Sequence, residues 1–147
     1  MHSLLSLLSP PPDLLRRFVE TPLHCRLRLG GSCVQLMTNE FQFLQALSGW
    51  ADSREQSAQE SVSWKLIADP DAGVPVMQPV ITNSGTVLTA WFGRGNLLSL
   101  DWECRMAYAF LSPQSAQLCA QFMAPMLSSW IAKRVQSSAA VEGHTCI

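Results

Sequence analysis

The stretch SLDWECRMAY holds the densest set of groups that could take part in a reaction. Asp101, Glu103 and Arg105 occupy every second position, and Cys104 lies between them. Paired carboxylates can do acid and base work, and a thiol can act as a nucleophile. Strand alternation, however, would place Cys104 on the face opposite to the two carboxylates. The pattern therefore favours a solvated strand face with a cross-strand ion pair, and a small enzyme using these residues is the least favoured of three hypotheses.

A second candidate pair is His24 beside Cys25; the remaining histidines are His2 and His144. An imidazole next to a thiol can generate a nucleophilic thiolate. Neighbouring side chains in a strand point to opposite faces, so these two side chains do not meet if the segment is a strand. We interpret His24 as an ordinary strand residue.

Metal and nucleotide sites have recognisable spacings, and the chain lacks them. The five cysteines are Cys25, Cys33, Cys104, Cys119 and Cys146. They form no C-x-x-C pair, which predicts free thiols in a reducing compartment. In DPDAG, Asp69 and Asp71 offer too few oxygens for Ca²⁺ and predict a turn. The GRGN stretch (residues 93–96) has neither the lysine nor the following helix of a phosphate-binding loop, and it predicts a hairpin turn. We therefore predict no catalytic, cofactor-binding or metal-binding residue.

Composition narrows the class of protein further. The 147 residues are 48% hydrophobic, enough for one core, while only 14% are charged and the net charge is −1. Scattered basic residues predict neither a nucleic-acid nor a membrane partner. Low charge and five tryptophans indicate that a partner covers some of the surface, with one or two exposed indoles marking an interface. The opening segment lacks a signal-peptide pattern and no apolar run is long enough to span a membrane, which predicts a cytoplasmic protein.

The first half of the chain alternates short elements. Residues 1–12 are predicted to form an irregular lead-in. Asp13 is expected to cap a short helix over residues 14–20. Two alternating runs around Gly30-Gly31 predict a β-hairpin. Asn39 is expected to cap a helix that ends near Gly49. Residues 51–61 are polar and predict a loop, and VSWKLIA predicts a strand.

The second half predicts more strands and one long helix. Residues 74–85 contain two prolines and predict an edge strand or an extended connection. The strands on either side of GRGN are expected to pair, with the second running on through Tyr108. Ser112 is expected to cap a long helix with Pro113 at its first turn and a kink at Pro125. That helix is expected to end near residue 140, before a turn at Gly143 and a new strand that begins with Thr145, Cys146 and Ile147.

This order of elements predicts an α+β domain, in which a mostly antiparallel sheet carries two or three helices on one face. The longest helix is the C-terminal one. We predict an N-terminal lead-in and short helix over residues 1–21 and a single domain over residues 22–147, whose C-terminal end we interpret as truncated.

Three quoted stretches resemble the N-terminal region of bacterial HPr-serine kinase/phosphatase-like proteins. The first is SLDWECRMAYAFLS, followed by proline, a helix containing APML and Gly-His-x-x-Ile; the others are LRLGGSCVQLMTNEFQFLQAL and VSWKLIADP. The resemblance covers residues from about 22 to 147. It implies that HTCI is the first half of a strand leading to a P-loop in a kinase-like domain. The family's P-loop, its lysine and its acid–base residues have no counterpart in this chain, so no family catalytic residue is assigned.

Two functions of different classes follow as expectations. The first is a non-catalytic accessory domain of an HPr-kinase-like protein, regulatory or substrate-presenting, with a protein partner: a kinase-like domain or a second copy of the chain. The alternative is a stand-alone module that binds a small apolar ligand or a peptide strand between the sheet and the long helix. The segment VPVMQPVITNSG is a candidate docking edge, although its prolines count against strand addition.

Overall fold

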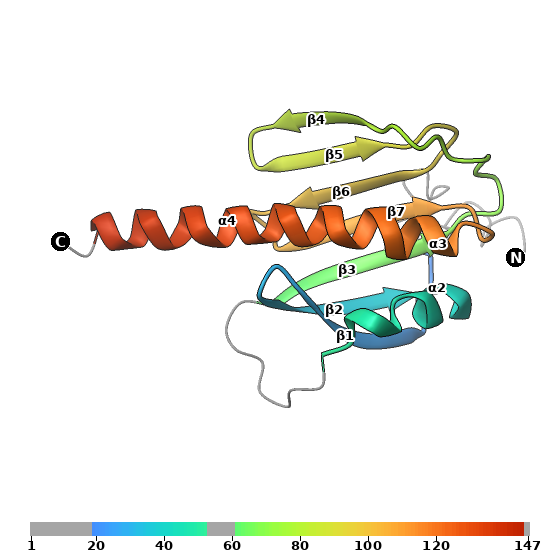
Figure 1. Cartoon of the computed structure of the whole chain (residues 1–147), viewed down its shortest axis with the longest axis horizontal. Helices are drawn as coiled ribbons and strands as arrows, with labels where there is room; N and C mark the ends of the chain where they lie inside the picture. The colour runs from blue at the N-terminus through green and yellow to red at the C-terminus, as the bar shows by residue number, and fades with distance from the viewer. Residues whose placement is uncertain (1–18, 53–60, 146–147) are drawn as a thin grey trace, which may run out of the picture.

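Seven strands form one sheet across which a long helix runs (Figure 1). This computed structural model describes residues 19–52 and 61–145. The strands are β1 (Leu23–Leu29), β2 (Ser32–Thr38), β3 (Ser61–Ala68), β4 (Val80–Ser84), β5 (Val87–Trp91), β6 (Leu97–Asp101) and β7 (Met106–Leu111). Their order in the sheet is β1-β2-β3-β7-β6-β5-β4, so β1 and β4 are the two edges.

Most neighbouring strands are antiparallel, and two pairs are parallel. The β1–β2 hairpin and the meander β4-β5-β6-β7 are antiparallel throughout. Strand β3 is parallel to β2 and to β7 and so joins the two antiparallel parts. A parallel pair needs a crossover connection, and α2 (Phe41–Ala46) with the 3₁₀ turn η1 (Ser48–Trp50) lies in the one between β2 and β3.

One face of the sheet is apolar and lies under the helices. Strand register aligns a row across five strands: Leu36, Trp64, Ala107, Leu100 and Leu88. The first four are completely buried, and Leu88 packs against them from a half-buried position. The alternating apolar pattern of these strands thus places their apolar side chains in one core.

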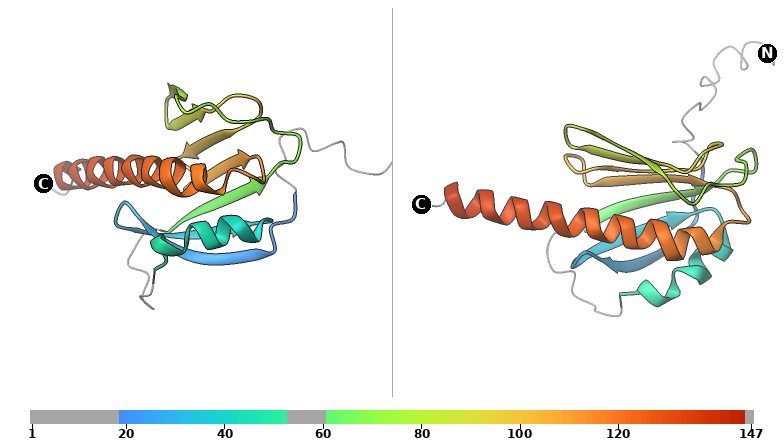
Figure 2. Two further views of the ribbon diagram at one scale, coloured as in Figure 1. Left: turned by 45° about the vertical axis from the view of Figure 1, so that its right-hand side comes forward. Right: turned by 45° about the horizontal axis from the view of Figure 1, so that its top comes forward.

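The helices cover this face together, as the two views of Figure 2 show. The C-terminal helical segment consists of α3 (Ala116–Leu118), the π-helical turn η2 (Cys119–Met123) and α4 (Ala124–Thr145). It buries Leu127, Trp130 and Ile131 against the sheet. The π-helical turn ends two residues before Pro125, whose missing N–H and bulky ring disturb regular α-helical bonding; the kink expected at Pro125 stays a prediction.

The predicted fold class is confirmed: the chain is α+β, its sheet is mostly antiparallel and its longest helix is C-terminal. The β1–β2 hairpin, strand β3, the DPDAG turn and the β4 edge strand are also confirmed. The predictions about residues 1–18 and 53–60 fall outside the described residues. These include His2, most of the helix over residues 14–20 and most of the polar loop. The division at residue 22 stays a prediction.

Three predictions about strands and the chain end were wrong. The second strand of the GRGN hairpin does not run through to Tyr108, because a turn at residues 102–105 separates β6 from β7. The helix does not stop near residue 140, because α4 continues through Gly143 to Thr145. The strand expected at Thr145 is therefore wrong at that residue, and residues 146–147 lie outside the described part.

Two helix caps were also wrong. The cap of α2 is Glu40, whose carboxylate accepts a hydrogen bond from the N–H of Gln42 at 3.1 Å. Asn39 instead pairs with the backbone of Ala68 through both ends of its amide, at 2.7 and 3.3 Å. The long helix begins after Ser115 rather than after Ser112, because residues 112–115 form a turn closed by the Ser115 N–H and the Ser112 carbonyl.

Candidate functional site

The candidate acid–base set lies in the turn between β6 and β7, where it has a structural role. Asp101 ends β6, and its Oδ1 accepts a hydrogen bond from the N–H of Cys104 at 3.3 Å. The Asp101 carboxylate raises the pKa of the exposed Cys104 thiol by hydrogen bonding and by its charge, with a smaller contribution from Glu103. The expected separation of Cys104 from Asp101 was therefore wrong, but the contact suppresses the thiolate, the opposite of nucleophile activation.

Arg105 completes this turn in an unusual backbone conformation. Its φ is 55°, in the left-handed region. Its guanidinium lies 3.8 Å from the centre of the Trp102 ring and donates to the carbonyl of Trp102. This stacking and hydrogen bonding hold the chain in the tight turn.

The other described cysteines are free thiols as well. Burial raises the pKa of the Cys25 thiol and, much more strongly, that of Cys119. Cys33 is buried and accepts hydrogen bonds to its sulfur from the guanidinium of Arg26 at 3.3 and 3.4 Å. Cys146 lies outside the described residues.

Strand alternation separates His24 from Cys25, as predicted. His24 is exposed, whereas Cys25 packs against the core from the helix-covered side. His144 lies in α4, and only its backbone is within the described part of the structure.

The remaining candidate loops are turns stabilised by their own side chains. The Asp69 carboxylate accepts from the Asp71 N–H at 2.9 Å. Asn96, completely buried, donates to the carbonyls of Gly73 and Gly93 at 2.9 and 2.8 Å and accepts from the Ser112 N–H at 2.9 Å. Within residues 19–52 and 61–145, no group of three or more His, Cys, Asp or Glu side chains is arranged to hold a metal ion.

The exposed large apolar side chains gather near one edge of the sheet. Of the seven in the described residues, all but Phe41 lie between residues 74 and 91. These six residues form what we call the β4 surface: Val74, Val76, Met77, Val80, Ile81 and Trp91. Residues 74–93 include no charged residue, and every residue of β4 is exposed. Trp91, 47% exposed, is the exposed tryptophan expected at an interface, whereas Trp64, Trp102 and Trp130 are buried.

The two edges of the sheet differ in how they are protected. At β1, the carbonyl of Arg26 accepts from the N–H of Asp52, and Leu27 forms a bridge with Ala51. Arg28 lies 3.6 Å from the Asp52 carboxylate. Covering segments and charged residues are common protections of edge strands. In the described part of the chain, no segment pairs with the outer side of β4, and β4 has no charged residue.

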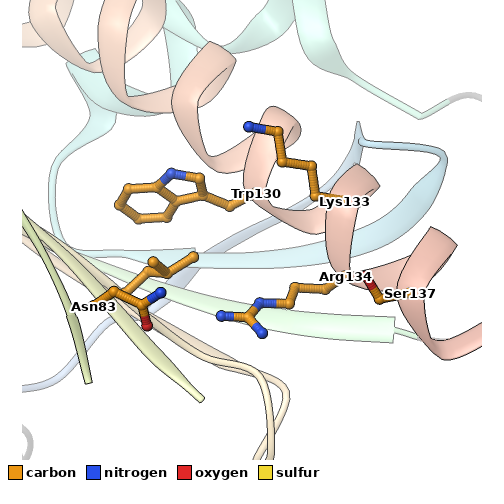
Figure 3. Close-up of a pocket in the computed structure, with 6 residues that line it drawn as sticks. Asn83, Trp130, Lys133, Arg134 and Ser137 are labelled. Carbon is orange, nitrogen blue, oxygen red and sulfur yellow. The ribbon is translucent and has the colours of Figure 1, made fainter. Parts of the chain in front are cut away.

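A cleft lies between α4 and the β4–β5 hairpin, on the helix-covered face (Figure 3). Its volume is about 370 Å³, and its lining residues are Asn83, Leu88, Trp130, Lys133, Arg134 and Ser137. In the view of Figure 3 the guanidinium of Arg134 extends towards Asn83, and Lys133 lies on the other side of the Trp130 indole. Neither Lys133 nor Arg134 was predicted from the sequence. Their spacing of three and four residues from Trp130 is the signal that puts them on the same helix face.

The chain matches no protein-family model, no curated protein and no solved structure. Among the helices of the described residues, none combines the length and apolar character needed to cross a membrane.

Proposed function

We propose that this chain is a non-catalytic protein-binding domain that docks an extended, uncharged segment of a partner protein along β4. The observation that carries the proposal is the β4 surface: an edge strand with every residue exposed, inside a run of twenty residues without charge. The two prolines that counted against strand addition, Pro75 and Pro79, precede β4 and leave the strand itself free of proline.

Backbone and side chains of β4 both support this mode of binding. A partner strand beside β4 would satisfy its outward-facing backbone groups, and its alternate side chains would contact the two faces of the sheet. On the face away from the helices, Val80 and Trp91 begin an apolar row that continues through Leu97, Phe110 and Ile67. Because this row is neutral and apolar, it matches an uncharged partner segment better than a charged one.

The chemistry of the described residues supports a binding role over catalysis. The contact between Asp101 and Cys104 suppresses the thiolate, and His24 and Cys25 lie on opposite faces. We further propose that the chain is the accessory domain of a bacterial HPr-kinase-like protein, on the resemblance of its sequence, with a kinase-like domain as the partner. The free thiols of the described cysteines fit a cytoplasmic location.

The test uses lysines placed on the edge strand. Val80 and Thr82 are exposed and point away from the helices, so V80K/T82K charges the edge without touching the core. Phe41→Lys is the matched control, because Phe41 is 55% exposed and lies outside the β4 surface. Peptides of twelve residues are selected from a display library on the purified chain, and their affinities are measured by calorimetry.

We expect selected peptides rich in β-branched residues that bind wild type and F41K equally and bind V80K/T82K at least about tenfold more weakly. Failure to enrich peptides, or equal binding to V80K/T82K, would contradict docking along β4. If light scattering shows a dimer of the wild-type chain and a monomer of V80K/T82K, the segment that docks along β4 would come from a second copy of the chain instead. Phosphate transfer from ATP by the purified chain would refute the non-catalytic role, and failure to bind a purified HPr-kinase-like ATPase domain would count against the family association.

A second candidate function, a small-ligand-binding module, is favoured by the cleft between α4 and the β4–β5 hairpin.

A further inference from the structure

Among the described residues, the cleft beside α4 is lined by two positive charges and no negative charge. Lys133 and Arg134 line it, and none of its six lining residues is acidic. Within the described residues, no ion pair or hydrogen bond engages either side chain. The protein as a whole has a net charge of −1, so this pair of cations is a local feature.

An apolar floor lies beside the two cations. Trp130 is 8% exposed and packs in the core, so its ring is held in place by its neighbours. Leu88 lies opposite Asn83 in the β4–β5 pair, which puts the Asn83 amide next to this floor. A cleft with an apolar wall and a few converging polar groups is the usual form of a small-molecule site.

We propose that this cleft binds a small aromatic carboxylate. The guanidinium of Arg134 holds the carboxylate through its two parallel N–H groups, and Lys133, on the other side of the Trp130 indole, adds positive charge at longer range. The flat apolar part of the ligand lies against Trp130 and Leu88, and the Asn83 amide hydrogen-bonds to its polar rim.

The size of the cleft and its position along α4 both favour a small carboxylate over a nucleotide. The volume of about 370 Å³ is near the lower end of ligand sites, which span roughly 300–1,000 Å³. Lys133 and Arg134 lie beyond the second turn of α4, away from the unbonded N–H groups at its N-terminus that favour phosphates. This inference deepens the second candidate function and does not depend on docking along β4.

The test measures binding of indole-3-acetate to the full chain by calorimetry and by amide chemical shifts. Neutral indole-3-acetamide and inorganic phosphate are the two comparison probes. The variant K133Q/R134Q removes both charges at solvent-accessible positions, and R94Q is the control, because Arg94 is exposed at the opposite end of β5. Circular dichroism melting checks that each variant is folded.

We expect indole-3-acetate to shift the amides of residues around Asn83, Leu88 and Trp130. Binding should weaken at least about tenfold in K133Q/R134Q, as the loss of charge-assisted hydrogen bonds predicts, and remain unchanged in R94Q. No binding at about 5 mM, where even millimolar sites are mostly occupied, would overturn the proposal. Equal binding of the acetamide would overturn the role of the cations, and equal binding of phosphate would overturn that of the apolar floor.

The same titrations on V80K/T82K separate the two proposals. Both lysines lie on the face away from the cleft, so this variant should keep indole-3-acetate binding while losing peptide binding. Loss of indole-3-acetate binding in V80K/T82K would contradict the assignment of the ligand to the helix-covered face.

Discussion

The N–H of Gly30 donates a hydrogen bond to Oγ of Ser128 at 2.8 Å, joining the β1–β2 turn to the long helix. The backbones are so close that a Cβ at Gly30 would lie 2.5 Å from the Ser128 carbonyl oxygen and 2.7 Å from the Ala132 nitrogen. Gly30 also has a φ of +59°, which other L-residues adopt only with strain. This one contact therefore fixes where α4 crosses the first hairpin of the sheet.

Gly30→Ala is expected to destabilise the fold by at least about 3 kcal/mol, because the new methyl group collides with helix backbone that cannot move aside. The matched control is Gly31→Ala. Gly31 has a φ of +82° but no atom within 4 Å of an added Cβ, so it should cost only the backbone strain, about 1 kcal/mol. Ser128→Ala removes the hydrogen bond alone and should also cost about 1 kcal/mol. Urea unfolding measures all three; equal losses for G30A and G31A would show that the close contact is absent.

Asn96→Ala is expected to cost about 2–4 kcal/mol, because it removes side-chain hydrogen bonds from three buried or partly buried backbone groups, although the Gly93 carbonyl keeps its bond from the backbone N–H of residue 96. Those groups are the carbonyls of Gly73 and Gly93 and the N–H of Ser112. Asn39→Ala is a strict comparison, since Asn39 also bonds backbone, at Ala68, but is exposed. Its loss should be about 1 kcal/mol. Thermal and urea unfolding measure the loss of stability in both variants. Similar losses of unfolding free energy would mean that water replaces the Asn96 contacts as easily as those of Asn39.

Much of this fold could be predicted from alternation of apolar and polar residues. Leu27 and Leu29 in β1, and Val62, Trp64 and Leu66 in β3, are buried as their spacing indicates. The turn between β6 and β7 could not be predicted, because its left-handed residue is Arg105 instead of glycine or asparagine. What stabilises that conformation is the stacking of Arg105 on Trp102, a contact that alternation does not reveal.

At the helix ends, the residues that usually cap or stop a helix do not do so in this protein. Asn39 fits the pattern of a cap, but its amide bonds to Ala68 on a neighbouring strand, and Glu40 caps α2 instead. Gly143 fits the pattern of a stop, yet α4 passes through it. Single residues at element ends therefore predict less than the spacing of a whole apolar face.

The two candidate surfaces were predictable to different degrees. The two prolines of residues 74–85 identified the β4 edge, because proline content is a local property of one segment. A ligand site between the sheet and the long helix was expected, but its lining residues were not identified, since the cleft brings together Arg134 of α4 and Asn83 of β4, and only the tertiary fold places the two together.

Asp101→Asn is expected to make Cys104 more reactive. The Asp101 carboxylate is the main cause of the raised pKa of this thiol, so removing its charge lowers the pKa and increases the thiolate fraction at pH 7.5. Asparagine keeps an oxygen that can accept from the Cys104 N–H, so the turn should persist. The rate of iodoacetamide alkylation at Cys104, followed by mass spectrometry, should rise several-fold.

Glu103→Gln is the control for that measurement. Glu103 makes the smallest contribution to the raised pKa of Cys104, so this variant removes one nearby charge with little effect on the thiol. A larger rate increase in E103Q than in D101N would mean that Asp101 does not contact the thiol.

Cys119 should make the folded protein lose stability in alkaline solution. Burial raises the pKa of its thiol far above the ordinary value of about 8.5, so the folded state keeps the proton while the unfolded state releases it. The stabilisation due to the protonated thiol is therefore complete below the unfolded pKa and falls by about 1.4 kcal/mol for each pH unit above it. Between pH 8 and 10, urea unfolding of wild type should show this extra slope, and Cys119→Ala and Cys119→Val should both remove it. The two variants change side-chain volume in opposite directions, so a slope lost in both belongs to the thiol, whereas parallel curves for wild type and variants would place Cys119 in contact with water.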